Sequence, residues 1–235
     1  MPTRFGIPQF PGSCDEVDTL LAASRVGEAE LLWHKDRDLK GVDVVIIPGG
    51  FSYGDYLRVG AIPPFSPVMQ AVAEHAAAGG LVLGICNGFQ VLTEAGLLPG
   101  ALLPNANLRF TCRQLDLTVE TRETALTHEL SQGDTLSIPA KHTTGRYFAP
   151  PAMLDEIERN GQVVLRYAPG ENFNGSVNDI AGISNAEGNV FGLMPHPEHA
   201  VDPLTGSADG LKLFQSLATS ATAVRNPALA TGDEF

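Results

Sequence analysis

The chain of 235 residues is long enough for one large α/β domain or two small ones. Hydrophobic residues make up 43% of it and charged residues 18%, a balance that supports a substantial core and excludes disorder of the whole chain. Because 27 acidic residues outnumber 15 basic ones, the net charge is −12, and we expect no nucleic-acid partner.

The first hundred residues alternate between short apolar runs and amphipathic segments. The pattern predicts strands at RFGIPQF, AELLWH, VDVVIIPGG and LVLGIC, and helices over residues 15–23, 68–78 and 87–95. The β-branched run VDVVIIPGG, which ends in two glycines, is typical of a buried parallel strand. Strands that alternate with helices indicate a parallel sheet covered on both faces.

After residue 108 the pattern changes. RFTCRQLDLTVETR alternates like an antiparallel pair or a long edge strand, QVVLRYA, IAGISN and VFGLMP follow as strands, and residues 210–222 form a predicted helix. We therefore expect a single α/β domain over residues 1–223, with a mixed, mostly parallel sheet flanked by helices. Residues 224–235 have little to bury and are predicted to form a mobile tail.

The segment GICNG, residues 84–88, lies between a predicted buried strand and a predicted helix. A sharp strand-to-helix turn crowds the positions two before and two after its apex, so glycine is expected at both. This pattern matches a nucleophile elbow with Cys86 at the apex, where the helix N-terminus favours the thiolate. A small buried cysteine or a phosphate-binding turn would give a similar context, so the assignment depends on finding a base.

A base and an orienting group occur in the segment MPHPEH, residues 194–199. Pro197 disfavours the α region for His196, so we expect an extended stretch in which residues two apart share a side. Glu198 would then fix the tautomer of His196 and stabilise its imidazolium. The alternatives are a proline-rich surface turn, or His199 as the base, although His199 lacks flanking prolines and a carboxylate two residues on.

The remaining histidines and cysteines show no ligand spacing. Four further histidines are scattered and the three cysteines form no CxxC pair, so we predict no metal site and no disulfide framework. Gly or Pro interrupts the apolar runs before they reach bilayer-spanning length, and the N-terminal segment lacks the apolar region of a signal peptide. We expect no membrane association and a cytoplasmic location.

With Cys86, His196 and Glu198 identified, the chain resembles the class I (triad) glutamine amidotransferases. The segments PGGFSYGDYLR (48–58) and GICNGFQ (84–90) are similar to those of the glutaminase subunits of phosphoribosylformylglycinamidine synthase, and GRY (145–147), IAGI (180–183) and GNVFGLMPHPE (188–198) agree. The likeness covers nearly the whole chain. It implies that the cysteine attacks the side-chain amide of glutamine, releases ammonia for de novo purine biosynthesis, and forms a glutamyl thioester that water cleaves.

The resemblance also implies an oxyanion hole formed by the backbone N–H groups of Gly50 and Asn87. Each such donor is typically worth about 3 kcal/mol in kcat. Gln90 matches the family position that faces the substrate. The alternative is that Gln90 lies on the surface of the helix and has no role in binding. Residues 51–58 are interpreted as a loop over the cysteine site, and we expect Arg58 in this loop to couple ammonia production to its use.

The sequence contains no Gly-x-x-x-x-Gly-Lys-Ser/Thr phosphate loop. We therefore expect no cofactor in this chain and place ATP and Mg on a separate partner, the large subunit of the synthase. A small bridging subunit is a further candidate partner.

Four residues depart from the pattern of the family. The family usually reads FPGSNCD, whereas this chain reads FPGSCD and has no asparagine before Cys14; it usually reads HGEGRY and NPNGS where this chain has Thr143, Thr144 and Phe173. We expect these departures to affect subunit contacts or coupling rather than the chemistry. Three alternatives stay open. They are a glutaminase subunit of another amidotransferase, a DJ-1-like protein (a group that commonly has histidine directly after the cysteine), and a non-catalytic regulatory homologue.

Overall fold

Eleven strands, five α-helices and five short 3₁₀ helices make up residues 1–225, the part of the chain that the computed structural model describes. The strands are β1 (Arg4–Gln9), β2 (Glu28–Trp33), β3 (Val44–Ile47), β4 (Leu81–Ile85), β5 (Ala101–Pro104), β6 (Thr111–Val119), β7 (Thr135–His142), β8 (Thr144–Phe148), β9 (Val163–Tyr167), β10 (Ile180–Ser184) and β11 (Val190–Leu193). The α-helices are α1 (Glu16–Ala23), α2 (Pro67–Ala77), α3 (Asn87–Glu94), α4 (Pro151–Arg159) and α5 (Asp209–Arg225). The 3₁₀ helices are η1 (Ser52–Asp55), η2 (Pro63–Phe65), η3 (Val177–Asp179), η4 (Pro197–His199) and η5 (Pro203–Thr205).

Nine of these strands form one sheet in the order β2-β1-β3-β4-β11-β10-β9-β6-β7, and β5 pairs with β8 in a small second sheet. The five strands from β2 to β11 are parallel, whereas the pairs from β11 to β7 are antiparallel. Every residue of β3 and β4 is buried, as expected for parallel strands with both faces covered. The predicted α/β class with a mixed sheet is therefore confirmed.

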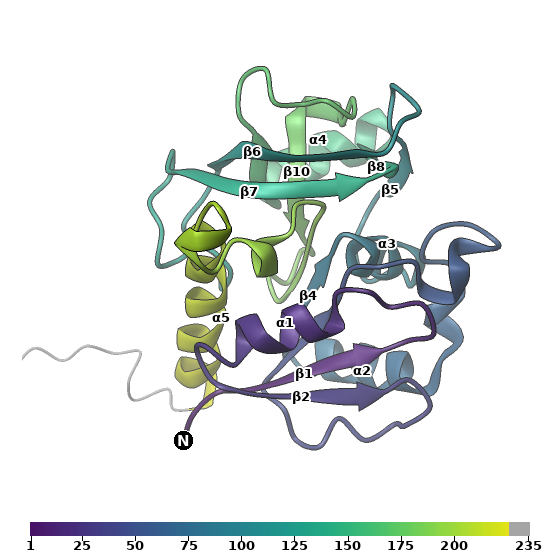
Figure 1. Cartoon of the computed structure of the whole chain (residues 1–235), viewed down its shortest axis with the longest axis vertical. Coiled ribbons are helices and arrows are strands. Elements are labelled where there is room, and N and C mark those ends of the chain that lie inside the picture. Colours follow the sequence, from purple (N-terminus) through teal and green to yellow (C-terminus); the bar gives the residue numbers. More distant parts are fainter. Residues whose placement is uncertain (226–235) are drawn as a thin grey trace, which may run out of the picture.

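Helices cover the parallel half of the sheet. In Figure 1, α1 lies in front of β1 and α2 lies behind it, while α5 stands beside α1 and packs against it. Helix α3 packs on β4 and β11. One continuous cluster of buried apolar side chains joins these helices to both halves of the sheet, so residues 1–225 share a single core.

The sheet brings two distant segments to one edge. Strand β11 pairs in parallel with β4, with Gly192 opposite Gly84 and Leu193 opposite Ile85. The turn after β4 and the turn after β11 therefore leave the sheet side by side, at the carboxyl ends of parallel strands where α/β folds place their sites. Cys86 and His196, which follow these two strands, therefore lie at a common edge of the sheet.

The structure corrects the prediction in the second half of the chain. Strand β6 lies between β9 and β7, so it is an inner strand, and β7 forms the edge. The sequence pattern did not indicate β5, β7, β8 or α4. In β7 the residue Pro139 weakens the strand pattern, but an edge strand tolerates its missing N–H. Helix α4 buries only Ile157, so its apolar stripe is narrow.

Helix α5 extends to Arg225, so the predicted domain boundary at residue 223 falls inside this helix. The rest of the predicted tail, residues 226–235, lies outside the described residues. No helix within residues 1–225 combines the length and apolar character needed to cross a bilayer.

Candidate active site

The turn that carries Cys86 is strained and has room only for glycine on either side. Cys86 has φ 51° and ψ −103°, a backbone conformation that costs a non-glycine residue on the order of 1–3 kcal/mol. A Cβ atom on Gly84 would collide with the backbone of Gly88, and one on Gly88 would collide with the carbonyl of Ile47. The reason given from the sequence for the two glycines is therefore confirmed. Cys86 directly precedes the first turn of α3.

His196 is buried beside this turn and is tightly bound to Glu198. Its backbone N–H donates to the carbonyl of Pro139 in β7 at 2.8 Å, and its side chain is 1% exposed. Nδ1 donates to Oε1 of Glu198 at 2.6 Å, which is short even for a charge-assisted hydrogen bond. Nε2 has no hydrogen-bond partner among the described residues, and His196 lines the same cavity as Cys86.

The predicted contact between His196 and Glu198 is present, but the predicted extended backbone is wrong. His196 itself has φ −109° and ψ 87°, outside the α region. The next three residues form the 3₁₀ helix η4, in which the N–H of Ala200 donates to the carbonyl of Pro197. Proline suits the first position of a helical turn because its φ is preset. The turn, rather than strand alternation, brings Glu198 to the imidazole.

The charges around His196 favour its protonated form. Burial acts to lower the pKa of His196, but the negative charges of Glu198 and Cys86 outweigh it and raise the pKa to about 10. At neutral pH the imidazole can therefore carry a proton beside the cysteine sulfur. This arrangement allows a thiolate–imidazolium pair, which is the reactive form of a cysteine nucleophile.

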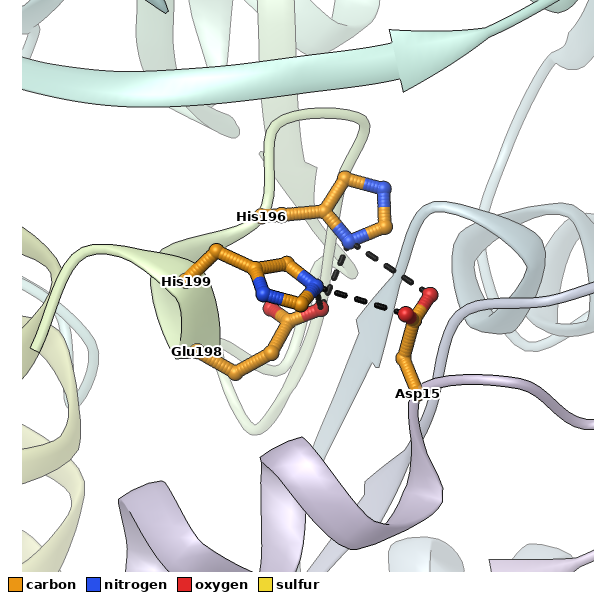
Figure 2. Close-up of side chains that lie close together, drawn as sticks. All are labelled: Asp15, His196, Glu198 and His199. Carbon is orange, nitrogen blue, oxygen red and sulfur yellow. Dashed lines mark hydrogen bonds and ion pairs between the residues drawn. The ribbon is translucent and has the colours of Figure 1, made fainter. Parts of the chain in front are cut away.

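A second carboxylate, Asp15, joins this network and was missed in the sequence. Figure 2 shows Asp15, from the start of α1, facing the two histidines. Its Oδ2 lies 3.7 Å from Nδ1 of His196, and its Oδ1 accepts from Nζ of Lys141 at 2.5 Å and from Nε2 of His199 at 3.3 Å. Burial raises the pKa of Asp15, but hydrogen bonds from His199 and Lys141 outweigh it and hold the pKa far below its usual range.

No local motif joins Asp15 to Lys141 or to the histidines. Asp15 directly precedes α1, Lys141 is in β7, and the histidines lie at the two ends of η4, so they meet only in the folded chain. His199 approaches Glu198 at 3.5 Å but is not among the residues that line the cavity with Cys86. This position favours His196 over His199 as the base.

Asp15, His196, Glu198 and His199 offer ligand atoms within 4.8 Å of one another, so they are a set that could hold a metal ion. The same atoms already form the hydrogen bonds and ion pairs drawn in Figure 2. A metal on Nδ1 of His196 would displace the proton shared with Glu198. The absence of a resident metal stays a prediction.

The residues expected to form the oxyanion hole and the substrate wall lie around the elbow. Gly50 lines the cavity and has φ 140°, a conformation suited to glycine. Asn87 begins α3, and its side chain accepts from the N–H of Ser52 at 3.1 Å and donates to Gln90 at 2.8 Å. Gln90 lines the cavity and donates to the carbonyl of Thr144 at 2.6 Å. The roles of Gly50, Asn87 and Gln90 stay predictions.

The residues at the departures from the family pattern lie in or next to the cavity that contains Cys86, and their effect on subunit contacts or coupling stays a prediction. Cys14, Thr143 and Thr144 line the cavity that contains Cys86, and the ring of Phe173 lies 5.1 Å from the ring of His142. Burial lowers the pKa of His142 to about 3, so its imidazole is neutral at physiological pH. Thr143 and Thr144 thus form part of the wall of this cavity.

The segment from Phe51 to Arg58 covers the site, as predicted. Phe51 and Asp55 both line the cavity. Arg58 donates to Glu94 of α3 from Nε at 2.8 Å and again from Nη2. The loop is thus tied to the helix that begins at the elbow.

Comparison with known proteins gives consistent matches over nearly the whole chain. Residues 3–217 match the family model of the CobB/CobQ-like glutamine amidotransferase domain. The phosphoribosylformylglycinamidine synthase subunit PurQ of Trichormus variabilis is 57% identical over 216 residues, which cover 91% of this chain and 96% of that protein. The subunit of the same name from Corynebacterium glutamicum is 57% identical over 219 residues, covering 92% and 97%.

Solved structures agree with this result. A chain in the structure of PurLQS from Thermotoga maritima superposes with a TM-score of 0.87 at 42% identity, covering 94% of this chain and 99% of that chain. A putative GMP synthase subunit from Thermoplasma acidophilum, at 12% identity and a TM-score of 0.66, shares the fold. The chain described here belongs to the CobB/CobQ-like glutamine amidotransferase family.

Proposed function

We propose that this chain is the glutaminase subunit of phosphoribosylformylglycinamidine synthase. It hydrolyses glutamine to glutamate and ammonia, and a separate ATP-dependent synthase uses the ammonia to convert formylglycinamide ribonucleotide to formylglycinamidine ribonucleotide in purine biosynthesis. The observation that carries the proposal is the strained elbow of Cys86 in one cavity with a buried His196 bound to Glu198 at 2.6 Å. The relatives named PurQ support the choice of synthase.

In the first half of the reaction, the thiolate of Cys86 attacks the side-chain carbonyl carbon of glutamine, and the carbonyl electrons move to oxygen. The backbone N–H groups of Gly50 and Asn87 stabilise this oxyanion, with Gln90 in the cavity wall. His196 then gives the proton on Nε2 to the leaving nitrogen. The C–N bond breaks, ammonia leaves, and a glutamyl thioester stays on the sulfur.

In the second half, water attacks the thioester carbon and gives a proton to the now neutral Nε2 of His196. The C–S bond breaks, glutamate leaves, and the thiolate–imidazolium pair is restored. Glu198 stabilises the imidazolium at both ends of this cycle, because its charge acts on Nδ1 while Nε2 gains and loses the proton.

The proposed partners follow from the chemistry of the synthase reaction. The reaction of the synthase consumes ATP, so we place ATP and Mg on the large subunit and no cofactor in this chain. The name PurLQS of the similar Thermotoga maritima structure supports a complex with other subunits. We propose the large subunit and a small bridging subunit as partners, and a cytoplasmic location for the complex.

The test is glutamate release from glutamine by the wild type and by Cys86→Ala, in the presence of the synthase subunits, ATP and formylglycinamide ribonucleotide. We expect release by the wild type and none by the variant. Cys86→Ala should still support synthesis when ammonium salts replace glutamine, which would show that the variant is folded and assembled. Release by neither protein, with ammonia-dependent synthesis intact, would contradict the proposal and favour a non-catalytic subunit.

A further inference from the structure

Asp55 is a carboxylate in the wall of the cavity, and no cationic side chain within residues 1–225 forms an ion pair with it. The cavity that contains Cys86 is also lined by the charged side chains of Asp15, Lys141 and Asp55. Asp15 and Lys141 form an ion pair with each other at 2.5 Å. Among the described residues no cationic side chain pairs with Asp55, and its Oδ1 is buried without a hydrogen-bond partner. The cavity thus contains one carboxylate whose charge no neighbouring side chain balances.

The neighbours of Asp55 leave its charge poorly stabilised. Burial raises the pKa of Asp55, and the groups that act in the opposite direction are the backbone N–H of Gly60 and the amide of Asn87. Both groups are neutral. A carboxylate in such surroundings gains from any cation that enters the cavity, because a charge-assisted hydrogen bond is about twice as strong as a neutral one.

The backbone around Asp55 is strained and anchored. Tyr53, Gly54 and Asp55 have consecutive φ values of 54°, 69° and 54°, and such a conformation costs each non-glycine residue on the order of 1–3 kcal/mol. The hydroxyl of Tyr53 is fixed by hydrogen bonds at 2.9 Å to Nδ1 of His34 and to Oγ of Ser66. Backbone strain that the surroundings maintain is typical of residues placed for a ligand.

The position of Asp55 suits one particular group of the substrate. Asn87, whose amide acts on Asp55, directly follows Cys86 in the chain. In glutamine the amino nitrogen is four bonds from the carboxamide carbon, roughly 5 Å when extended. Asp55 is next to the residue that follows the nucleophile and lines the same cavity, so its carboxylate can face the α-ammonium while the carboxamide lies at the sulfur.

We propose that Asp55 binds the α-ammonium group of glutamine and makes the cavity selective for amides of α-amino acids. The proposal rests on the proposed glutaminase function and deepens it. Asp55 is a specificity-determining residue, because it contacts the substrate away from the reacting bond. Its carboxylate can form an ion pair with the positively charged α-ammonium of glutamine, whereas the carboxylate of Asp15 already forms an ion pair with Lys141.

The experiment compares two substrates in the assembled complex. Glutamine and 4-carbamoylbutanoate share the carboxamide and the carboxylate, but the second compound lacks the amino group. For Asp55→Asn we expect kcat/KM for glutamine to fall about 10- to 100-fold, mostly through KM. The value for 4-carbamoylbutanoate should change less than about twofold, the size of an ordinary surface substitution. The preference of the enzyme for the amino acid should therefore largely disappear.

A binding measurement separates recognition from damage to the site. Iodoacetamide is uncharged, so it should alkylate Cys86 equally fast in the wild type and in Asp55→Asn, while protection by glutamine should need about 10- to 100-fold more glutamine in the variant. Asp116→Asn is the matched control, since Asp116 is exposed on β6, and it should behave as the wild type in both assays.

Each outcome has one meaning. If the wild type hydrolyses glutamine and Asp55→Asn keeps its preference over 4-carbamoylbutanoate, the role of Asp55 is refuted and the glutaminase function stands. An equal loss for both substrates, together with slower alkylation of Cys86, would also refute it and would make Asp55 a structural residue of the loop. Absence of glutamine hydrolysis by the wild-type complex would overturn the proposed function and this inference with it.

Discussion

Replacing Glu198 by glutamine should remove a charge from the buried pair while keeping its shape. The pKa of His196, raised to about 10 from an ordinary value of 6.5, corresponds to about 5 kcal/mol in favour of the imidazolium. Glu198 is the first of the groups that raise it. We expect kcat for glutamine hydrolysis to fall about 10³- to 10⁴-fold, as for other triads that lose their carboxylate. KM should change little, since Glu198 is away from the substrate wall.

Alkylation of Cys86 by iodoacetamide, followed by peptide mass spectrometry, tests the physical cause directly. Without the charge of Glu198 the imidazolium is less stable, so the paired thiolate should be less populated and alkylation at pH 7 should slow about tenfold or more. Glu158→Gln serves as the control, because Glu158 is paired with Arg166 outside the site. Unchanged alkylation together with a loss of kcat below about tenfold would refute the electrostatic role given to Glu198.

Three further predictions follow from the site. Gly88→Ala should lower the free energy of unfolding by about 1–3 kcal/mol and abolish glutaminase activity, because its Cβ meets the carbonyl of Ile47. Gly79→Ala is the control: its Cβ meets open space but its φ of 86° strains an alanine, so it should lose about 1 kcal/mol of stability and keep its glutaminase activity. Arg58→Gln breaks the ion pair with Glu94 and should reduce glutamine-dependent synthesis more than basal glutamate release; equal losses would contradict a coupling role. Because the folded pKa of His196 lies above its unfolded value, its contribution to stability is complete below about pH 6.5 and is lost as the pH rises through about 10. Urea titrations should therefore show that the free energy of unfolding of the wild type exceeds that of His196→Gln by less at pH 10 than at pH 7. A difference that stays constant over this range would argue against the raised pKa.

The sequence by itself determined the features that depend on short-range rules. The glycines at 84 and 88 identified the elbow, because a tight strand-to-helix turn excludes a Cβ at both positions. The continuous apolar runs VVII and LVLGI identified buried parallel strands. The contact between His196 and Glu198 was also predicted, since the two residues lie two positions apart in the chain. The helical turn that brings them together was not predicted.

Only the tertiary structure decided which distant residues share the cavity. Asp15 and Lys141 lie 126 positions apart and meet because the fold brings the end of β7 beside the residue that precedes α1. In the sequence, Asp55 is one residue of a glycine-rich loop with no feature that sets it apart. Only the folded structure shows that its described neighbours are neutral groups rather than cations. Local sequence patterns indicate secondary-structure propensity and spacing over a few residues. The pKa and charge of a buried group depend instead on the charges and hydrogen-bonding groups of all the elements that the fold packs around it.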